Sequence, residues 1–386
     1  MGPHGLEAKP SSPWGSARWR WRGSVALLAV AVGFVIYPLV EGESDVINSD
    51  WPAFATGGRL ILSDPAHLYD FEVQRRVELD VTHGRSLVTL GIHGILPFVA
   101  PAWVAFFAVP FELLGTNLGG RLWILFGLAT LALGLYLAVR PRAPSRILPA
   151  FASVPTALLL LNAQLDGMVA LGLGAAISLW SRQFMAGVCL GLTLLKPQLI
   201  LPIGAALLVT RRWRVLGGWA VSGIVLWGAA GLLNPRWVLD WLPALNGPVR
   251  PGSREVDFAH FGTALPSAFQ GYAVAILSLL ALVAVLALAS RRGSEFRPAA
   301  AILVAGGVLV APHALPTDFV LVALALAIWG EAEWSDWLLL SIGAAIAALT
   351  PAPIPAVIGV LVIGWVCLRA GGIISWRRER APMSAG

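Results

Sequence analysis

This sequence has few charged residues. Only 12% of its 386 residues are charged and 57% are hydrophobic, whereas a soluble chain has ~25% charged residues. So few charges could not cover the surface of a water-soluble protein of this length. Apolar runs recur from Ser24 almost to the C-terminus. The composition therefore predicts an all-α polytopic membrane protein, a bundle of about 11–13 transmembrane helices.

The few charges that are present also exclude a partner class. The formal net charge of +6 comes from short arginine clusters between apolar runs. This pattern is typical of membrane topology and not of a surface that contacts nucleic-acid phosphates. The lipid bilayer is the expected partner, and nucleic acid is not.

Cysteine is scarce as well, and the two that occur, Cys189 and Cys367, lie far apart in hydrophobic runs. They predict neither a disulfide framework nor a metal cluster. The sequence has no Walker-type phosphate loop, dinucleotide fingerprint or serine elbow. We therefore expect no metal, no cofactor and no nucleotide-driven mechanism. Four histidines do not form a metal-ligand pattern with neighbouring carboxylates or cysteines: His67, His83, His93 and His260.

The chain begins with a polar segment, a first apolar run and an acidic segment. Residues 1–23 end in alternating Trp and Arg, which predicts a disordered cytoplasmic tail with an interfacial anchor. No cleavage-site pattern follows the run 24–40, so we interpret it as a signal anchor. Residues 41–85 contain nine of the 21 acidic residues, which predicts an outer loop. Within it, 50–62 and 70–80 have helical patterning typical of short amphipathic helices at the membrane surface.

Residues 24–371 are predicted to form one transmembrane domain. A proline-containing loop over 235–270 is expected outside, and 372–386 as a cytoplasmic C-terminal tail. Arginine-rich turns mark the cytoplasmic side, at Arg211-Arg212-Trp213-Arg214, Arg291-Arg292 and Arg377-Arg378. Further apolar segments run at roughly 86–114, 121–139, 147–161, 165–180, 184–209, 214–233, 271–290, 299–312, 316–330, 337–350 and 354–371.

One turn conflicts with this topology. In a twelve-helix count Arg140, Arg142 and Arg146 fall on the outer side, against the positive-inside tendency. Two interpretations remain open. Either that turn violates the tendency, or 184–209 is a re-entrant helical hairpin broken at Pro197 and not one kinked helix.

Polar residues at membrane depth are costly and are therefore functional candidates. In the first outer loop, Asp50 stands where a helix would begin. It is either an N-cap or a general base that takes a proton from an acceptor hydroxyl at the mouth of a cavity. Asp45 is the reserve candidate. The surrounding motif reads Ser49-Asp50-Trp51-Pro52-Ala53-Phe54-Ala55-Thr56-Gly57-Gly58-Arg59, then Leu68-Tyr69-Asp70.

Lys196 is one of only two lysines, and it lies inside an apolar run. Its ammonium group must find an anion, a carbonyl or water, and Pro197 frees backbone groups beside it. One interpretation is a structural ion pair with an acid at membrane depth such as Asp166. The interpretation that we favour is binding of the phosphate of a lipid-linked substrate. Gln198 follows directly and joins the candidate site.

Two further polar breaks interrupt the apolar segments. Asn162-Ala163-Gln164-Leu165-Asp166 is either a solvated turn or part of a cavity wall, with Gln164 as a candidate contact. In Ala311-Pro312-His313-Ala314-Leu315-Pro316-Thr317-Asp318, His313 is either an interface histidine or a hydrogen-bond donor to a phosphate or hydroxyl. Asp318 is interpreted as a cap of the following helix.

The order of these motifs resembles glycosyltransferase family 87 of the GT-C superfamily. The resemblance covers roughly residues 45–330. It rests on the first-loop motif, on Leu96-Pro97-Phe98-Val99-Ala100-Pro101, on Asn-Ala-Gln at 162–164, on Ala186-Gly187-Val188-Cys189-Leu190-Gly191-Leu192 through Lys196-Pro197-Gln198, on the Arg-Arg-Trp-Arg turn, and on the late Pro-His near an Asp.

The resemblance implies a GT-C-type bundle and a membrane enzyme of the cell envelope. It would transfer a mannose- or arabinose-like sugar from a polyprenyl-phosphate donor to a glycan or glycolipid acceptor on the extracytoplasmic face, with inversion and without a metal. Asp50 would be the base, and Lys196, Arg59 and His313 would face the departing phosphate. The chain is expected in the plasma or inner membrane with both termini cytoplasmic. The alternative is a multi-pass transporter or flippase of lipid-linked sugars, although the internal symmetry expected of a transporter is not found.

Overall fold

The protein is a bundle of α-helices with one short antiparallel hairpin, made of β1 (Leu87–Thr89) and β2 (Ile92–Gly94). The computed structural model describes residues 13–85, 87–89, 92–140, 144–246, 267–351 and 353–374. The α-helices are α1 (Pro13–Val40), α2 (Glu43–Ile47), α3 (Trp51–Ser63), α4 (Phe71–Val81), α5 (Ala102–Glu112), α6 (Thr116–Val139), α7 (Ile147–Phe151), α8 (Val154–Leu161), α9 (Asp166–Ser178), α10 (Gln183–Leu190), α11 (Leu201–Val209), α12 (Trp213–Leu233), α13 (Trp237–Asn246), α14 (Ser267–Arg291), α15 (Phe296–Val310), α16 (Phe319–Trp329), α17 (Trp334–Leu349) and α18 (Ile354–Ala370).

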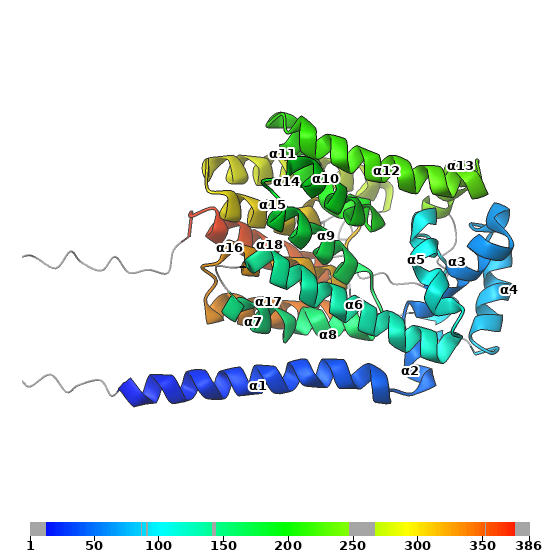
Figure 1. The fold of residues 1–386 in the computed structure, drawn as a ribbon, viewed down its shortest axis with the longest axis horizontal. Helices are drawn as coiled ribbons and strands as arrows, with labels where there is room; N and C mark the ends of the chain where they lie inside the picture. The colour runs from blue at the N-terminus through cyan, green and yellow to red at the C-terminus, as the bar shows by residue number, and fades with distance from the viewer. Residues whose placement is uncertain are drawn as a thin grey trace, which may run out of the picture.

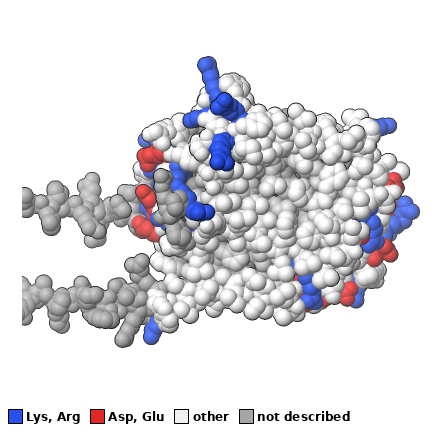
Figure 2. Space-filling model, viewed as in Figure 1, with Lys and Arg blue, Asp and Glu red and all other residues white. Residues whose placement is uncertain are grey.

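The membrane character predicted from composition is confirmed. Among the described residues, four helices are long and apolar enough to cross a membrane by length and composition, and further apolar helical segments of 10–17 residues accompany them. On the face shown in Figure 2, charged side chains lie mainly near the two ends of the molecule, and a band without charge separates them. The α16 helix is apolar on every side and all of its residues are buried, as expected for a helix at the centre of a bundle.

The bundle has two distinct ends (Figure 1). We call the end formed by α3, α4 and α13 the loop end, and the end where α1 begins and α18 finishes the tail end. The α1 helix starts at Pro13, so residues 13–23 are helical and do not belong to a disordered tail as the sequence suggested. Residues 1–12 and 375–386 lie outside the described part of the chain.

The two short helices predicted in the first loop are found as α3 and α4. The α3 helix does not lie at the surface, however, because nearly all of its residues are buried. Small residues let α5 approach it: a Cβ at Gly58 would lie 3.2 Å from the backbone nitrogen of Val109, and one at Gly57 would lie 2.6 Å from the Phe98 ring. The glycine pair of this motif therefore serves close packing.

The apolar stretch 86–114 is not one helix, contrary to the sequence prediction. Of its described residues, only those of α5 are helical, and residues 95–101 have no regular secondary structure, since Pro97 and Pro101 disfavour a helix there. Side chains of α4 form hydrogen bonds with the backbone groups of this segment, as a neighbouring strand would in a sheet. Gln74 Oε1 accepts the Phe98 N–H at 2.9 Å, Gln74 Nε2 donates to the Phe98 carbonyl at 2.9 Å, and Glu78 Oε1 accepts the Leu96 N–H at 2.8 Å.

This arrangement determines the end of the bundle at which the arginine turn lies. Because α5 stays with α3 at the loop end, α6 runs from the loop end to the tail end, and Arg140 and Arg146 lie at the tail end (Figure 1). Segment 184–209 is a re-entrant hairpin, the second interpretation left open by the sequence. Its two ends meet, since the Arg212 guanidinium carbon lies 6.0 Å from the Trp180 ring centroid, and short 3₁₀ turns around Lys196 form its tip.

The buried carboxyl of Glu78 predicts a pH-dependent stability. Burial raises the pKa of Glu78 from 4.5 to about 8, so between these values the native state binds more protons than the unfolded state. Stability should therefore fall, by on the order of 1–3 kcal/mol, as the pH rises from about 5 to about 8. Glu78→Gln keeps an acceptor for Leu96 and should remove this dependence, as measured by thermal unfolding in detergent. Glu72→Gln, exposed on the same helix, is the matched control, and an unchanged slope in Glu78→Gln would refute the assignment.

Candidate functional site

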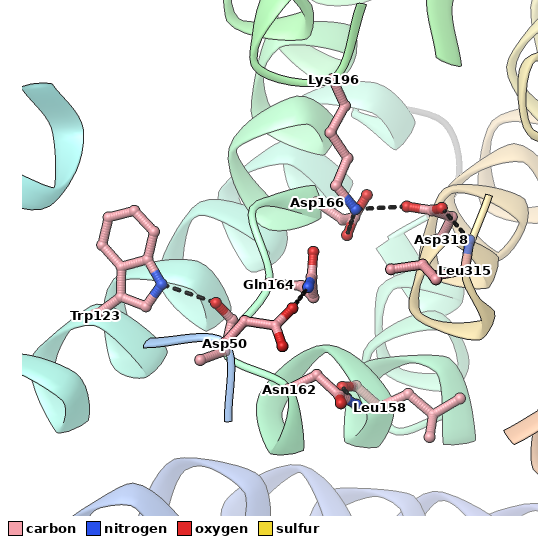
Figure 3. Close-up of polar contacts among 10 residues, drawn as sticks. Asp50, Trp123, Leu158, Asn162, Gln164, Asp166, Lys196, Leu315 and Asp318 are labelled. Atoms are coloured by element: carbon pink, nitrogen blue, oxygen red, sulfur yellow. Dashed lines mark hydrogen bonds and ion pairs between the residues drawn. The ribbon is translucent and has the colours of Figure 1, made fainter. Parts of the chain in front are cut away.

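Asp50 occupies the N-cap position of α3, but its side chain does not cap the helix. The Ser49 hydroxyl takes that role by accepting the Trp51 N–H at 3.2 Å. Asp50 instead turns to the segment between α8 and α9. Its backbone N–H donates to the Asn162 carbonyl at 3.3 Å, and Gln164 Nε2 donates to its Oδ2 (Figure 3). The cap interpretation therefore does not explain this carboxylate.

The 162–166 segment is a buried turn. Gln164 is 6% exposed and Asp166 is fully buried, so the solvated-turn interpretation is wrong for these two residues. Asn162 Nδ2 donates to the Leu158 carbonyl at 2.8 Å and closes the end of α8. Ala163 has a φ of +50°, and its carbonyl accepts Trp123 Nε1–H at 2.8 Å. These contacts turn the chain so that Gln164 faces Asp50 and Asp166 faces Lys196 (Figure 3).

Lys196 lies between two carboxylates. Its Nζ is 2.8 Å from Asp166 Oδ2 and 2.6 Å from Asp318 Oδ1. The Lys196 side chain is 11% exposed, and those of Asp166 and Asp318 are 0% and 2% exposed. The ion pair with Asp166 considered from the sequence is present, and Asp318 is a second partner. The negative charges of the two carboxylates compensate the positive charge of the Lys196 ammonium group, so it attracts a phosphate less strongly.

Local breaks in the helices place these three groups. Pro197 has no N–H and follows Lys196, whose φ of −134° and ψ of 73° end the helical path. On the opposite side, the Leu315 N–H donates to Asp318 Oδ2 at 2.7 Å. Asp318 therefore closes its own 3₁₀ turn with one oxygen and binds Lys196 with the other. Three breaks in the apolar helices, at 162–166, 196–197 and 311–318, meet at this point.

Asp50, Gln164, Asp166, Lys196 and Asp318, which we call the polar site, come from four separate parts of the sequence (Figure 3). His313 and Gln198 are half-buried and belong to the same two breaks as Asp318 and Lys196.

Two candidates have other partners. Arg59 binds Asp80 and, at 2.7 Å, Glu112, and so ties α3 to α4 and α5. Asp45 accepts the Gly42 N–H at 3.0 Å at the start of α2. Each residue therefore has a local structural role, Arg59 between the first-loop helices and Asp45 at the start of α2.

Two groups that shape the polar site were not found from the sequence. Trp123 orients the 162–166 turn, and a tryptophan within an apolar helix gives no signal of this contact. Asp318 was interpreted as a helix cap. Its position in a proline-bracketed break at membrane depth was the available signal that it could pair with a buried cation.

Fold and polar site define a polytopic helical membrane protein with a buried polar centre at the junction of its bundle and its first loop. A family model, described as glycosyltransferase family 87, matches residues 98–316. The chain therefore belongs to glycosyltransferase family 87, and it is a membrane glycosyltransferase. The match includes Gln164, Asp166, Lys196, Gln198 and His313 and begins after Asp50. No curated protein and no solved structure matches the chain significantly.

The ion-paired geometry predicts a strong and rescuable effect at Lys196. Lys196→Met leaves two buried carboxylates without a cation and should lower the free energy of unfolding by about 3–5 kcal/mol. The triple variant Asp166→Asn, Lys196→Met, Asp318→Asn removes all three charges and should regain most of that loss. Thermal unfolding in detergent measures both.

The matched control is Arg75→Met, which breaks an exposed ion pair with Glu72 and should cost at most ~1 kcal/mol. A triple variant as unstable as the single one would show that the charges do not act as a compensated unit.

Proposed function

We propose that this family member transfers a mannose- or arabinose-like sugar from a polyprenyl-phosphate donor to a hydroxyl of a glycan or glycolipid acceptor. The reaction inverts the anomeric carbon and needs no metal. The observation that supports it best is the Asp50 carboxylate, held by Gln164 where the first-loop helices meet the membrane bundle. A donor whose leaving group is a lipid phosphate must react at the membrane interface, and in this proposal the interface lies at this junction. The family membership speaks against the transporter or flippase alternative.

Asp50 is assigned as the general base. The acceptor hydroxyl gives its proton to the Asp50 carboxylate while its oxygen forms the new bond to the anomeric carbon. The bond from that carbon to the phosphate oxygen breaks, and its electron pair leaves with the polyprenyl phosphate. Gln164 is assigned a positioning role, because its amide donates to one carboxylate oxygen and fixes the plane of the group. This differs from the substrate contact expected from the sequence.

The departing phosphate is assigned to His313 and Gln198, which are half-buried and are close in sequence to Asp318 and Lys196, respectively. Lys196 and Arg59 each face two carboxylates, so their charges are largely compensated before a substrate binds. We therefore give Lys196 the narrower role of joining the walls of the site, and Arg59 that of joining the first-loop helices.

The loop end is assigned to the extracytoplasmic face and the tail end to the cytoplasm. Each of four described arginine-containing turns lies where a helix reaches or leaves the tail end (Figure 1). These turns contain Arg140, Arg146, Arg211–Arg214 and Arg291–Arg292. The positive-inside tendency then places both termini in the cytoplasm. The plasma or inner membrane is the proposed location.

Donor class and catalytic base can be tested together. Protein reconstituted in vesicles should release polyprenyl phosphate from a lipid-linked sugar in the presence of a chelator. A panel of mannose, arabinose and glucose donors identifies the sugar. Asp50→Asn should lower the rate by about 10²–10⁴-fold without changing the unfolding temperature, whereas Asp45→Asn should keep most of the activity. A requirement for a nucleotide sugar and Mg²⁺ would refute the donor class, and an active Asp50→Asn would refute the base.

Gln164 can be distinguished from a substrate-binding residue by the split between kcat and KM. Gln164→Met removes the donor to Asp50 and should lower kcat by about 10–100-fold, with the KM for the donor changed less than about threefold. Gln198→Met, the matched control, should show the opposite split. A raised KM with unchanged kcat in Gln164→Met would return Gln164 to the substrate-contact role.

A further inference from the structure

An apolar cavity lies at the tail end, away from the polar site. It has a volume of about 180 Å³, is open on one side, and is lined mainly by α9, α10, α11 and α15. Its inner lining includes Leu173, Leu190, Leu207 and Val304. Small side chains on two of the helices, such as Ala206 and Ala300, leave this space unfilled. An apolar cavity of ~150 Å³ stays dry and accepts a hydrocarbon, so this one suits a hydrocarbon chain better than water.

The mouth of the cavity differs from its interior. Trp180 and Phe296 stand there with ring centroids 4.8 Å apart, and Thr210 and Arg212 complete the lining. The Arg212 guanidinium carbon is 6.0 Å from the Trp180 centroid. An apolar interior with an aromatic and cationic mouth matches an amphiphile that lies at a membrane interface.

The charge around the mouth is positive. Arg211, Arg212 and Arg214 are exposed on the turn between α11 and α12, where basic atoms gather in the upper part of the surface view (Figure 2). The neighbouring acid, Glu295, is 3.0 Å from Arg292 and is therefore paired. A group that binds beside Arg212 is expected to be an anion.

We propose that this cavity binds one acyl chain of an anionic phospholipid of the tail-end leaflet, with the headgroup phosphate on Arg212. Both arms of the re-entrant hairpin line the cavity, Leu190 from α10 and Leu207 from α11. Lys196 is at the tip of that hairpin. A bound chain packs between the arms and α15, and so stabilises the hairpin that carries Lys196 into the polar site. This inference does not depend on the sugar donor.

Lipid titration of the delipidated full chain tests the proposal. Phosphatidylglycerol, phosphatidylcholine with the same acyl chains and soluble glycerol phosphate are compared. Native mass spectrometry counts retained lipids, and the unfolding temperature reports stabilisation. Phosphatidylglycerol should be retained and raise the unfolding temperature, phosphatidylcholine should bind about tenfold more weakly, and glycerol phosphate should have no effect. Equal binding of the two lipids, or an equal effect of glycerol phosphate, would overturn the proposal.

Variants place the lipid in the cavity. Ala206→Phe fills the space and should lower phosphatidylglycerol affinity at least tenfold, whereas Ala220→Phe, exposed on α12, should not. Arg212→Gln should weaken binding about tenfold, and Arg291→Gln, exposed at the same end, should not. If Ala206→Phe does not fold, the smaller Ala300→Leu takes its place. Unchanged retention in the cavity-filling and Arg212 variants, or equal losses in their controls, would show that the lipid binds elsewhere.

Discussion

The fold depends on one requirement: an ammonium group buried in a membrane bundle must be matched by anions. Lys196 meets it through Asp166 and Asp318 at 2.8 and 2.6 Å. Each carboxylate comes from a different break in the helices, so the ion pairs join α9, the hairpin and the 311–318 segment at one point. Removing one partner would leave uncompensated charge at low dielectric. The breaks are therefore fixed relative to one another, although the backbone is irregular at all three.

Asp166, which binds Lys196, lies only two residues after Gln164, which connects the bundle to the first loop through Asp50. Gln164 donates to Asp50, and Asp166 accepts from Lys196, within one buried turn. The turn has little freedom because Trp123 Nε1–H and the Asp50 N–H donate to its Ala163 and Asn162 carbonyls, and Asn162 Nδ2 donates to the Leu158 carbonyl at the end of α8. A catalytic group must be held within a fraction of an ångström of its working position. In the proposed mechanism the buried ion pair supplies that rigidity, and it does so without binding the substrate.

The sequence predicted what depends on composition and local pattern, and it failed where long-range contacts decide. The helices at 50–62 and 70–80 were found because their periodicity is local. The 86–114 stretch was assigned as helix because apolar content does not distinguish a helix from an irregular buried segment. Gln74 and Glu78 bind the backbone of that segment. In the sequence they look like ordinary polar residues of an amphipathic helix, because nothing local shows that α4 packs against residues 96–98. Likewise, Lys196 was identified as unusual by its surroundings, but its partner Asp318 is 122 residues away, and no local spacing relates the two.

The misassigned stretch also explains why the arginine turns seemed inconsistent. A spanning helix at 86–114 would reverse the direction of every later segment. With α5 kept at the loop end, and with 184–209 returning to the end where it began, Arg140, Arg146 and the Arg211–Arg214 turn lie together at the tail end. In the proposed orientation these described arginine turns face the cytoplasm, as the positive-inside tendency expects. These two irregular segments also build the polar site. The α5 segment keeps α3, which begins beside Asp50, at the loop end, and the 184–209 hairpin brings Lys196 to the interior of the bundle.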